Sequence, residues 1–328
     1  MADETGPAPG AVSAWVAYGA LVLGFVAVGT ATQQRDVVAG LWVTEALAIA
    51  LPAIIAVRGA GLPAAPYLGL RAPRAAHLAA AVLLAVANQP VVSFLTWGAR
   101  ALAPPAWVDD FDSLQRVLDV VFAQKAVPMI VTVSIAAPLG EELFFRGYAV
   151  PALARSWGPA VAAVVSGAMF SGLHVNKVGF AGLWEIGILL AVLRLWSGSL
   201  WPSVLCHATN NAVAGAAFLL GWEDPSIPPP PWLLALGAVL FVAGVALAVR
   251  VLRRLPRPPE EAVRASAPSA GFDPLRAPFL ELIWLASVAL GVAQFLRLVP
   301  PMPMSAWAGL GGAAAIAAAA SASRDAPA

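Results

Sequence analysis

Apolar residues run along this chain in long blocks, and charged residues fall mainly between them. A helix that crosses a bilayer needs about 20 consecutive apolar residues, which is close to the length of most of these blocks. The pattern therefore predicts an all-α, polytopic transmembrane helix bundle with about 8–10 spans. The predicted spans are residues 14–32, 37–57, 76–99, 127–154, 158–175, 179–196, 200–222, 232–252, 279–297 and 302–320.

Residues 106–125 interrupt the series of spans with a mixed pattern. Four apolar side chains recur there at helical spacing, and polar side chains occupy the rest of the helical turn. The apolar positions are Leu114, Val117, Leu118 and Val121, and the polar positions are Asp112, Gln115, Arg116 and Asp119. This pattern predicts an amphipathic helix that lies on the membrane surface.

Composition places the chain in the membrane class. It has 328 residues, of which 60% are hydrophobic and 11% charged, whereas a soluble domain carries about 25% charged residues. The formal net charge of +1 gives no attraction for a polyanion, so we expect a lipid bilayer and no nucleic acid among the partners. The single cysteine, Cys206, excludes an internal disulfide framework. The alanine-rich sequence, with Arg used in preference to Lys, is typical of a bacterial protein.

Basic residues are distributed unevenly between the predicted loops. Most of the 19 Lys and Arg residues fall in loops that follow even-numbered spans. Because positively charged loops stay in the cytoplasm, this predicts a multi-pass protein of the bacterial inner membrane with both termini in the cytoplasm. Residues 1–10 lack the basic region of a secretory signal, so we expect the first span to be retained.

Three parts are predicted along the chain. Residues 1–105 hold N-terminal transmembrane helices, and residues 106–222 hold the amphipathic helix and a core that concentrates the polar residues of the spans. Residues 223–328 add further C-terminal helices, which are interrupted by a Pro-rich, charged linker at 253–275.

Ionisable side chains inside the apolar blocks are candidates for function, because a charge in a bilayer costs free energy and usually forms an ion pair or has a functional role. Glu142 and Arg146 lie four residues apart on one helix face, which predicts an ion pair. Glu141 points about 100° away from that face. Glu45 and Glu185 are further glutamates within spans. We interpret them as structurally paired or cavity-lining residues and not as catalytic ones.

The expected turn near Trp157 and Gly158 sets the depth of two candidates. Glu141 precedes this turn and His174 follows it by nearly the same number of residues, about 25 Å along each helix. We therefore expect the Glu141 carboxylate and the His174 ring to lie within about 7 Å of each other. His207 and Asn211 share one face of a later span.

These residue types have the chemistry needed to hydrolyse an amide bond. Glu141, beside a second carboxylate in a poorly solvated setting, suits a general base that takes a proton from water. Asn211 offers an amide N–H to a developing oxyanion. Glu141, His174 and His207 are also a donor set for zinc with an open fourth position, so the residues leave a metal-independent and a zinc mechanism open.

Three motifs stand in a fixed order on three apolar segments. They are E-E-x-x-x-R at Glu141, Glu142 and Arg146, F-x-x-x-H at Phe170 and His174, and H-x-x-x-N at His207 and Asn211. Together they resemble the CPBP intramembrane proteases, the family of the CAAX prenyl endopeptidases and of bacterial Abi and bacteriocin-processing proteins. The resemblance covers residues 125–220.

The resemblance implies an intramembrane endopeptidase with a cavity that opens toward the cytoplasm. It implies that Glu141 activates water together with His174, and that His207 and Asn211 stabilise the tetrahedral intermediate. Glu142, Arg146 and Phe170 are then supporting residues. Members have been described both as metalloproteases and as glutamate peptidases, so no cofactor is certain and zinc is the candidate. We expect a peptide or membrane-protein substrate, and not a prenylated one because the sequence looks bacterial.

Other functions fit the same polar residues less well. In a proton-coupled or ion-coupled transporter the glutamates and histidines would relay protons, but such carriers usually contain repeated halves, and no internal repeat is found here. A non-catalytic membrane scaffold would have no chemical reason to keep Glu141 together with both histidines. A polar network that only specifies helix packing is the third alternative.

Overall fold

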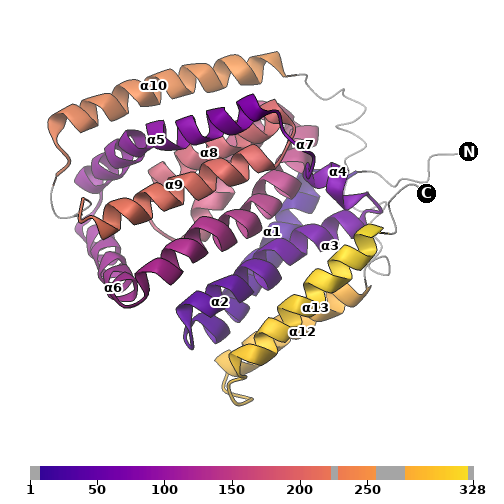
Figure 1. The fold of residues 1–328 in the computed structure, drawn as a ribbon. Coiled ribbons are helices and arrows are strands. Elements are labelled where there is room, and N and C mark those ends of the chain that lie inside the picture. Colours follow the sequence, from indigo (N-terminus) through magenta and orange to yellow (C-terminus); the bar gives the residue numbers. More distant parts are fainter. Residues whose placement is uncertain (1–7, 223–227, 256–277, 324–328) are drawn as a thin grey trace, which may run out of the picture. The chain divides into compact units, whose positions relative to one another are not determined.

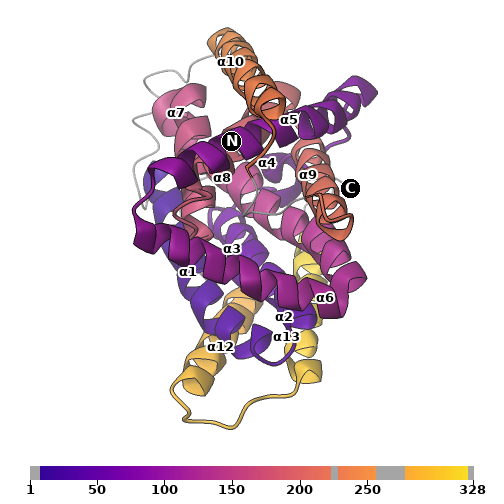
Figure 2. The same ribbon diagram turned by 90° about the vertical axis from the view of Figure 1, so that its left-hand side faces the viewer.

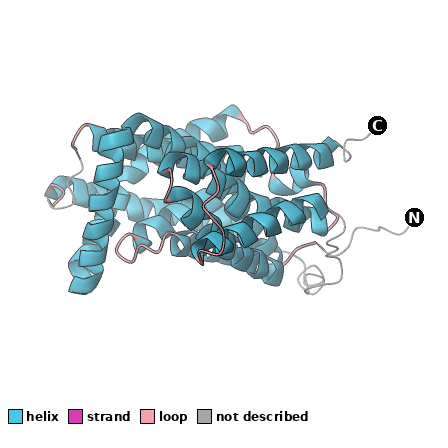
Figure 3. Ribbon diagram, turned by 90° about the horizontal axis from the view of Figure 1, so that it is seen from below, coloured by secondary structure: helices cyan, strands magenta, loops and turns pink. Residues whose placement is uncertain are grey.

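The computed structural model describes residues 8–222, 228–255 and 278–323, and in these ranges the chain forms helices and no strand (Figure 3). Seven of the described helices are long and apolar enough to cross a membrane. The predicted class, a polytopic all-α bundle, is therefore confirmed. The segment Met304–Ala320, within the last predicted span at 302–320, is a shorter apolar helix. Except for residues 253–255, the predicted linker at 253–275 lies outside the described residues.

The chain divides into two compact units, and neither is continuous in sequence. Unit 1 comprises residues 1–71, 139–158 and 257–328, and unit 2 comprises residues 72–138 and 159–256. The division into 1–105, 106–222 and 223–328 follows the order of the sequence and stays a prediction.

Unit 1 brings the first and the last helices of the chain together (Figure 1). Its helices are α1 (Ala11–Gln33), α2 (Val37–Thr44), the π-helix η1 (Glu45–Ala50), α3 (Leu51–Gly59), α4 (Ala64–Leu68), the π-helix η2 (Leu143–Ala149), α12 (Pro278–Phe295) and α13 (Met304–Ser323). Helix α12 packs on α1, and both α12 and α13 contact η1. The C-terminal helices are thus part of the core of unit 1.

Local signals in the sequence fix the start of α2. The Asp36 side chain accepts hydrogen bonds of 3.0 Å from the backbone N–H groups of Val38 and Ala39, which satisfies two donors at the helix start. Nearby, the Arg35 guanidinium donates to the backbone O of Met302, just before α13. These contacts join the connection between α1 and α2 to the connection between α12 and α13.

Unit 2 is built around α5. Its helices are α5 (Ala75–Leu102), the first part of α6 (Pro105–Glu142), the second part of α7 (Val150–Leu173), α8 (Phe180–Ser197), α9 (Trp201–Leu219) and α10 (Pro231–Arg254). Helices α8, α9 and α10 each contact α5, and α10 lies beside α5 in both views (Figure 1, Figure 2). Close approach needs small residues, and the backbones of Gly167 in α7 and Gly187 in α8 meet directly.

The long helical stretch from α6 to α7 is interrupted at the two places that the sequence predicts. Lys125 has non-helical dihedrals (φ −138°, ψ 40°), which separates the amphipathic segment from the span that follows. Gly158 has φ 81°, in the left-handed region that favours glycine, and Pro159 starts the next helical segment. The turn expected near Trp157 and Gly158 is therefore confirmed.

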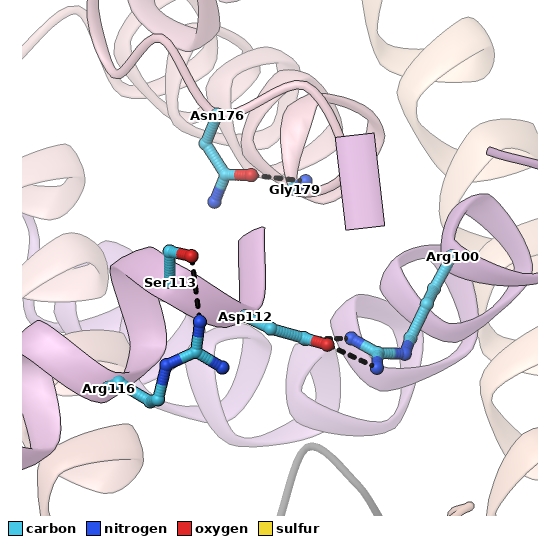
Figure 4. Close-up of polar contacts among 6 residues, drawn as sticks. All are labelled: Arg100, Asp112, Ser113, Arg116, Asn176 and Gly179. Carbon is cyan, nitrogen blue, oxygen red and sulfur yellow. Dashed lines mark hydrogen bonds and ion pairs between the residues drawn. The ribbon is translucent and has the colours of Figure 1, made fainter. Parts of the chain in front are cut away.

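Charged side chains anchor the amphipathic segment within unit 2 (Figure 4). The Arg100 guanidinium near the end of α5 binds the Asp112 carboxylate with both nitrogens, and the Nη2 to Oδ2 distance is 2.9 Å. Leu114 and Val117 on the apolar face remain exposed. This exposed face agrees with a helix that rests on the membrane surface, which stays a prediction.

Replacing Gly291 by alanine should destabilise unit 1. A Cβ built on Gly291 lies 2.5 Å from the Ala27 backbone O, so α12 and α1 would have to separate. Overpacking of this kind costs about 1–3 kcal/mol of unfolding free energy. Thermal unfolding in detergent measures the loss. Gly19→Ala on α1 is the control, because a Cβ there meets nothing within 4 Å. Equal losses in the two variants would contradict the assigned packing.

Candidate active site

The double-glutamate motif lies in unit 1, where α6 passes into η2. Arg146 Nη1 donates to Glu142 Oε1 at 2.9 Å, and both side chains are fully buried. The ion pair predicted from the spacing of four residues is therefore present. Arg146 also lies 5.7 Å from the centre of the Phe145 ring, which gives the guanidinium an aromatic neighbour.

A third glutamate lies beside Glu141 in the same unit. Glu45 begins η1, and its carboxyl is close enough to that of Glu141 for the two to interact electrostatically. Both side chains are buried. A Cβ built on Gly140 would collide with the Glu45 carboxyl and lie 3.0 Å from the Glu45 backbone O. Because Gly140, which precedes Glu141, has no side chain, it leaves room for the Glu45 carboxyl.

Two π-helices lie at or directly after these glutamates. Glu45 is the first residue of η1, and Glu142 directly precedes η2, which contains Arg146. A π-turn inserts one extra residue into a helix, rotates the side chains that follow, and is frequent at functional sites. Apolar periodicity does not reveal such turns, and the sequence predicted ordinary helices at both places.

Phe170 organises the two histidines in unit 2. Its ring centre lies 4.8 Å from that of His174 and 5.6 Å from that of His207. Its backbone O lies 2.9 Å from His174 Nδ1. Because a carbonyl only accepts, Nδ1 of His174 carries a proton in this arrangement. Phe170 thus contacts both imidazoles and holds a proton on Nδ1 of His174.

His174 and His207 differ in their surroundings. His174 lies just after the end of α7 and is exposed, whereas His207 is buried within α9. The turn before α9 is set by Gly198, which has φ 66° and ends α8, and by Pro202 in the first turn of α9. The Gly-Ser-Leu-Trp-Pro sequence therefore determines where the helix with His207 begins.

The loop after His174 is fixed by its own polar contacts. The Gly179 N–H donates to Asn176 Oδ1 at 2.8 Å (Figure 4). Val175 adopts φ 50°, a left-handed conformation that ends the helix. Lys177 Nζ lies 2.8 Å from Asp110 Oδ2 in the amphipathic segment. The histidine therefore stands on a loop that is tied to the start of α6.

Asn211 belongs to a chain of amides in unit 2. Its Nδ2 donates to the backbone O of Val133 at 2.7 Å, and its Oδ1 accepts from Asn210 Nδ2 at 3.3 Å. Asn210 Oδ1 in turn accepts from Gln89 Nε2 at 2.8 Å. The sequence predicted Asn211 as a site residue, whereas Gln89 and Asn210 were not recognised.

The structure thus gathers the predicted residues in two groups. Unit 1 holds Glu141, Glu142 and Arg146, and unit 2 holds Phe170, His174, His207 and Asn211. The expected approach of Glu141 to His174 joins the two groups and stays a prediction. Within the described part of either unit, no three His, Cys, Asp or Glu side chains are arranged to hold a metal ion. Zinc at this site stays a prediction.

Comparison with known proteins identifies the segment that contains these motifs. Residues 123–213 match the family model "Type II CAAX prenyl endopeptidase Rce1-like". This Rce1-like segment nearly coincides with residues 125–220, where the resemblance to the CPBP proteases was predicted. The expected family resemblance is therefore confirmed for this part of the chain.

A curated relative matches a similar length of sequence. An Escherichia coli protein described as "Uncharacterized 24.3 kDa protein" is 30% identical over 117 residues, which is 33% of this chain and 50% of that protein. The chain thus spans about half the length of this relative. No solved structure matches the chain.

All seven predicted site residues lie inside the Rce1-like segment, from Glu141 to Asn211. Glu45 and Gln89 lie outside it. A search for the family motifs alone would therefore miss both side chains. The packing of η1 on η2 in unit 1 reveals Glu45, and the packing of α5 on α9 in unit 2 reveals Gln89.

Proposed function

We propose that this protein is an intramembrane endopeptidase that hydrolyses a peptide bond with water activated by Glu141 and His174. The observation that supports this most directly is the Rce1-like segment, which contains every residue that such chemistry needs. Seven helical stretches of the described residues are long and apolar enough to cross a membrane, so we expect the substrate to be a peptide or a membrane protein that reaches the bilayer.

In the proposed reaction Glu141 is the general base. Its carboxylate takes a proton from water, and the oxygen of that water attacks the carbonyl carbon of the peptide bond. The carbonyl oxygen becomes negatively charged in the tetrahedral intermediate. Glu141 then returns the proton to the nitrogen as the C–N bond breaks, which releases an amine and a carboxylic acid.

His174 and the third motif, His207 with Asn211, have separate tasks. With its Nδ1 proton held by the Phe170 carbonyl, His174 presents the Nε2 lone pair as an acceptor for the attacking water. His207 and Asn211 donate hydrogen bonds to the developing oxyanion. Glu142 and Arg146 support the helix turn that carries Glu141 through their buried ion pair.

The experiment that tests this function uses purified protein in detergent with a library of quenched fluorogenic peptides. Wild type should cleave a subset of the peptides, and Glu141→Ala purified in the same way should cleave none of them. Identical cleavage by both preparations would assign the activity to a contaminant. A folded wild type that cleaves no peptide in the library and no membrane-protein substrate would refute the proposal.

Chelation should leave the activity of the wild type unchanged. His174 lies on the loop after α7, whereas His207 lies in α9, where it already faces Phe170 and shares its helix face with Asn211. This arrangement favours a metal-independent glutamate mechanism. Peptide cleavage is measured before and after treatment with a chelator, and zinc is quantified by elemental analysis. Stoichiometric zinc that is lost together with activity, with both restored by added metal, would reverse this assignment.

A further inference from the structure

We infer that Gln89 is a positioning residue that sets the orientation of the Asn211 amide through Asn210. This inference rests on the proposed function, in which Asn211 stabilises an oxyanion. Gln89 lies in α5 and the two asparagines lie in α9. The hydrogen bond between Gln89 and Asn210 therefore joins residues that are 121 positions apart in sequence. All the side chains involved belong to unit 2.

The hydrogen bonds run in one direction from Gln89 to Val133. Gln89 Nε2 donates to the Ala85 backbone O at 3.0 Å and to Asn210 Oδ1 at 2.8 Å. Asn210 Nδ2 donates to Asn211 Oδ1 at 3.3 Å, and Asn211 Nδ2 donates to the Val133 backbone O at 2.7 Å. Both ends of the chain are backbone carbonyls, which only accept.

This polarity permits one orientation of each amide. If the Asn210 amide turned over, its NH₂ would face the NH₂ of Gln89 and its oxygen would face the oxygen of Asn211. If Asn211 turned over, its oxygen would face the Val133 carbonyl. Each reversal replaces two hydrogen bonds by two repulsive contacts in a poorly solvated place. Gln89, acting through Asn210, and the Val133 carbonyl therefore hold Asn211 in one orientation from its two ends.

The orientation of Asn211 decides whether it can act on an oxyanion. An amide NH₂ is planar and carries two hydrogens, so the hydrogen bond to Val133 O also fixes the direction of the second N–H. This second N–H is the donor that the proposed function requires. With the amide reversed, a carbonyl oxygen would meet the oxyanion and destabilise it.

A purely structural role for Gln89 in joining α5 to α9 makes a different prediction. The loss of a structural contact lowers stability, and its effect on turnover is independent of Asn211. The loss of a positioning contact lowers turnover only while Asn211 is present. A double-mutant cycle between Gln89 and Asn211 separates the two roles.

The experiment compares Gln89→Met, Asn211→Ala and the double variant as purified full-length protein with one fluorogenic peptide that the wild type cleaves. Methionine keeps the length of the side chain and removes its hydrogen bonds. We expect Gln89→Met to lower kcat about tenfold with KM nearly unchanged, which is the effect of one lost hydrogen bond. Asn211→Ala should lower kcat about 100-fold to 1,000-fold. The double variant should be no slower than Asn211→Ala.

A neighbouring amide on α5 provides the matched control. Asn88 is buried near the Glu185 side chain and takes no part in the chain of amides that ends at Asn211. The effect of Asn88→Leu on kcat should therefore multiply with that of Asn211→Ala. Thermal unfolding of each variant shows whether a change in kcat comes from a loss of folded protein.

A second variant tests the next link. Asn210→Asp still accepts from Gln89 but has no N–H for Asn211 Oδ1, so it should lower kcat to a similar extent as Gln89→Met even though Gln89 is intact. The Asn210→Asp variant also allows the proposal to be tested if Gln89→Met does not fold. Losses for Gln89→Met and Asn211→Ala that multiply in the double variant would overturn the positioning role. Full activity of Asn211→Ala would instead overturn the oxyanion role in the proposed function.

Discussion

Glu141→Gln should abolish peptide hydrolysis and leave the protein folded. Glutamine has nearly the same shape as glutamate, but its amide cannot take a proton from water. The buried position beside Glu45 tolerates this change, because the substitution removes one of two carboxyl groups that interact there. Turnover is measured with purified protein and a fluorogenic peptide, and folding is measured by thermal unfolding. We expect a thermal midpoint at or above that of the wild type.

Glu45 is the alternative candidate for the general base, because its carboxyl lies near that of Glu141. The prediction must therefore distinguish between these two glutamates. Glu45→Gln, prepared in parallel, should keep measurable turnover. Glu185→Gln in α8 is a further control, since Glu185 belongs to unit 2, whereas Glu45 and Glu141 belong to unit 1. If Glu45→Gln abolished hydrolysis while Glu141→Gln retained it, the base would be Glu45 and the role assigned to Glu141 would be wrong.

The sequence predicted the helices because their signals are local. Apolar blocks of the length of a bilayer mark the spans, and the breaks at Lys125 and Gly158 fall where the amphipathic pattern ends and where glycine precedes proline. The π-turns at Glu45 and Leu143 have no such signal. The two discontinuous units also depend on packing between distant helices, such as α1 with α12, which periodicity within one helix does not encode.

The same distinction applies to the candidate site. The Glu142 and Arg146 pair follows from a spacing of four residues within one helix, and the structure contains it. The electrostatic interaction between Glu45 and Glu141 and the chain from Gln89 to Asn211 join residues about 100 positions apart, so no spacing rule indicates them. Glu45 was recognisable only as an ionisable residue within an apolar block, without an assigned partner.

Glu142→Gln should lower stability strongly, because it removes the negative charge that faces a fully buried guanidinium. Arg146 and Glu142 are both 0% exposed and lie 2.9 Å apart. Removing one partner of a buried ion pair costs about 3–5 kcal/mol, since the remaining charge stays in a medium that solvates it poorly. Thermal and denaturant unfolding in detergent measure the loss.

An exposed ion pair of similar length provides the matched control for this prediction. Lys177 and Asp110 lie 2.8 Å apart, but their side chains are 47% and 67% exposed. Asp110→Asn should therefore cost about 0–1 kcal/mol, because water solvates the lysine when its partner is removed. Similar losses in Glu142→Gln and Asp110→Asn would contradict the assignment of burial as the cause.

The double variant Glu142→Gln with Arg146→Met separates charge from shape. If the single variant is unstable because a buried charge has lost its counter-charge, removing that charge as well should restore much of the stability. Turnover per folded molecule then shows what the pair contributes to catalysis. A stable double variant with wild-type kcat would limit the pair to supporting the fold. A stable double variant with reduced kcat would show that the ion pair also orients Glu141, which precedes Glu142 directly in the chain.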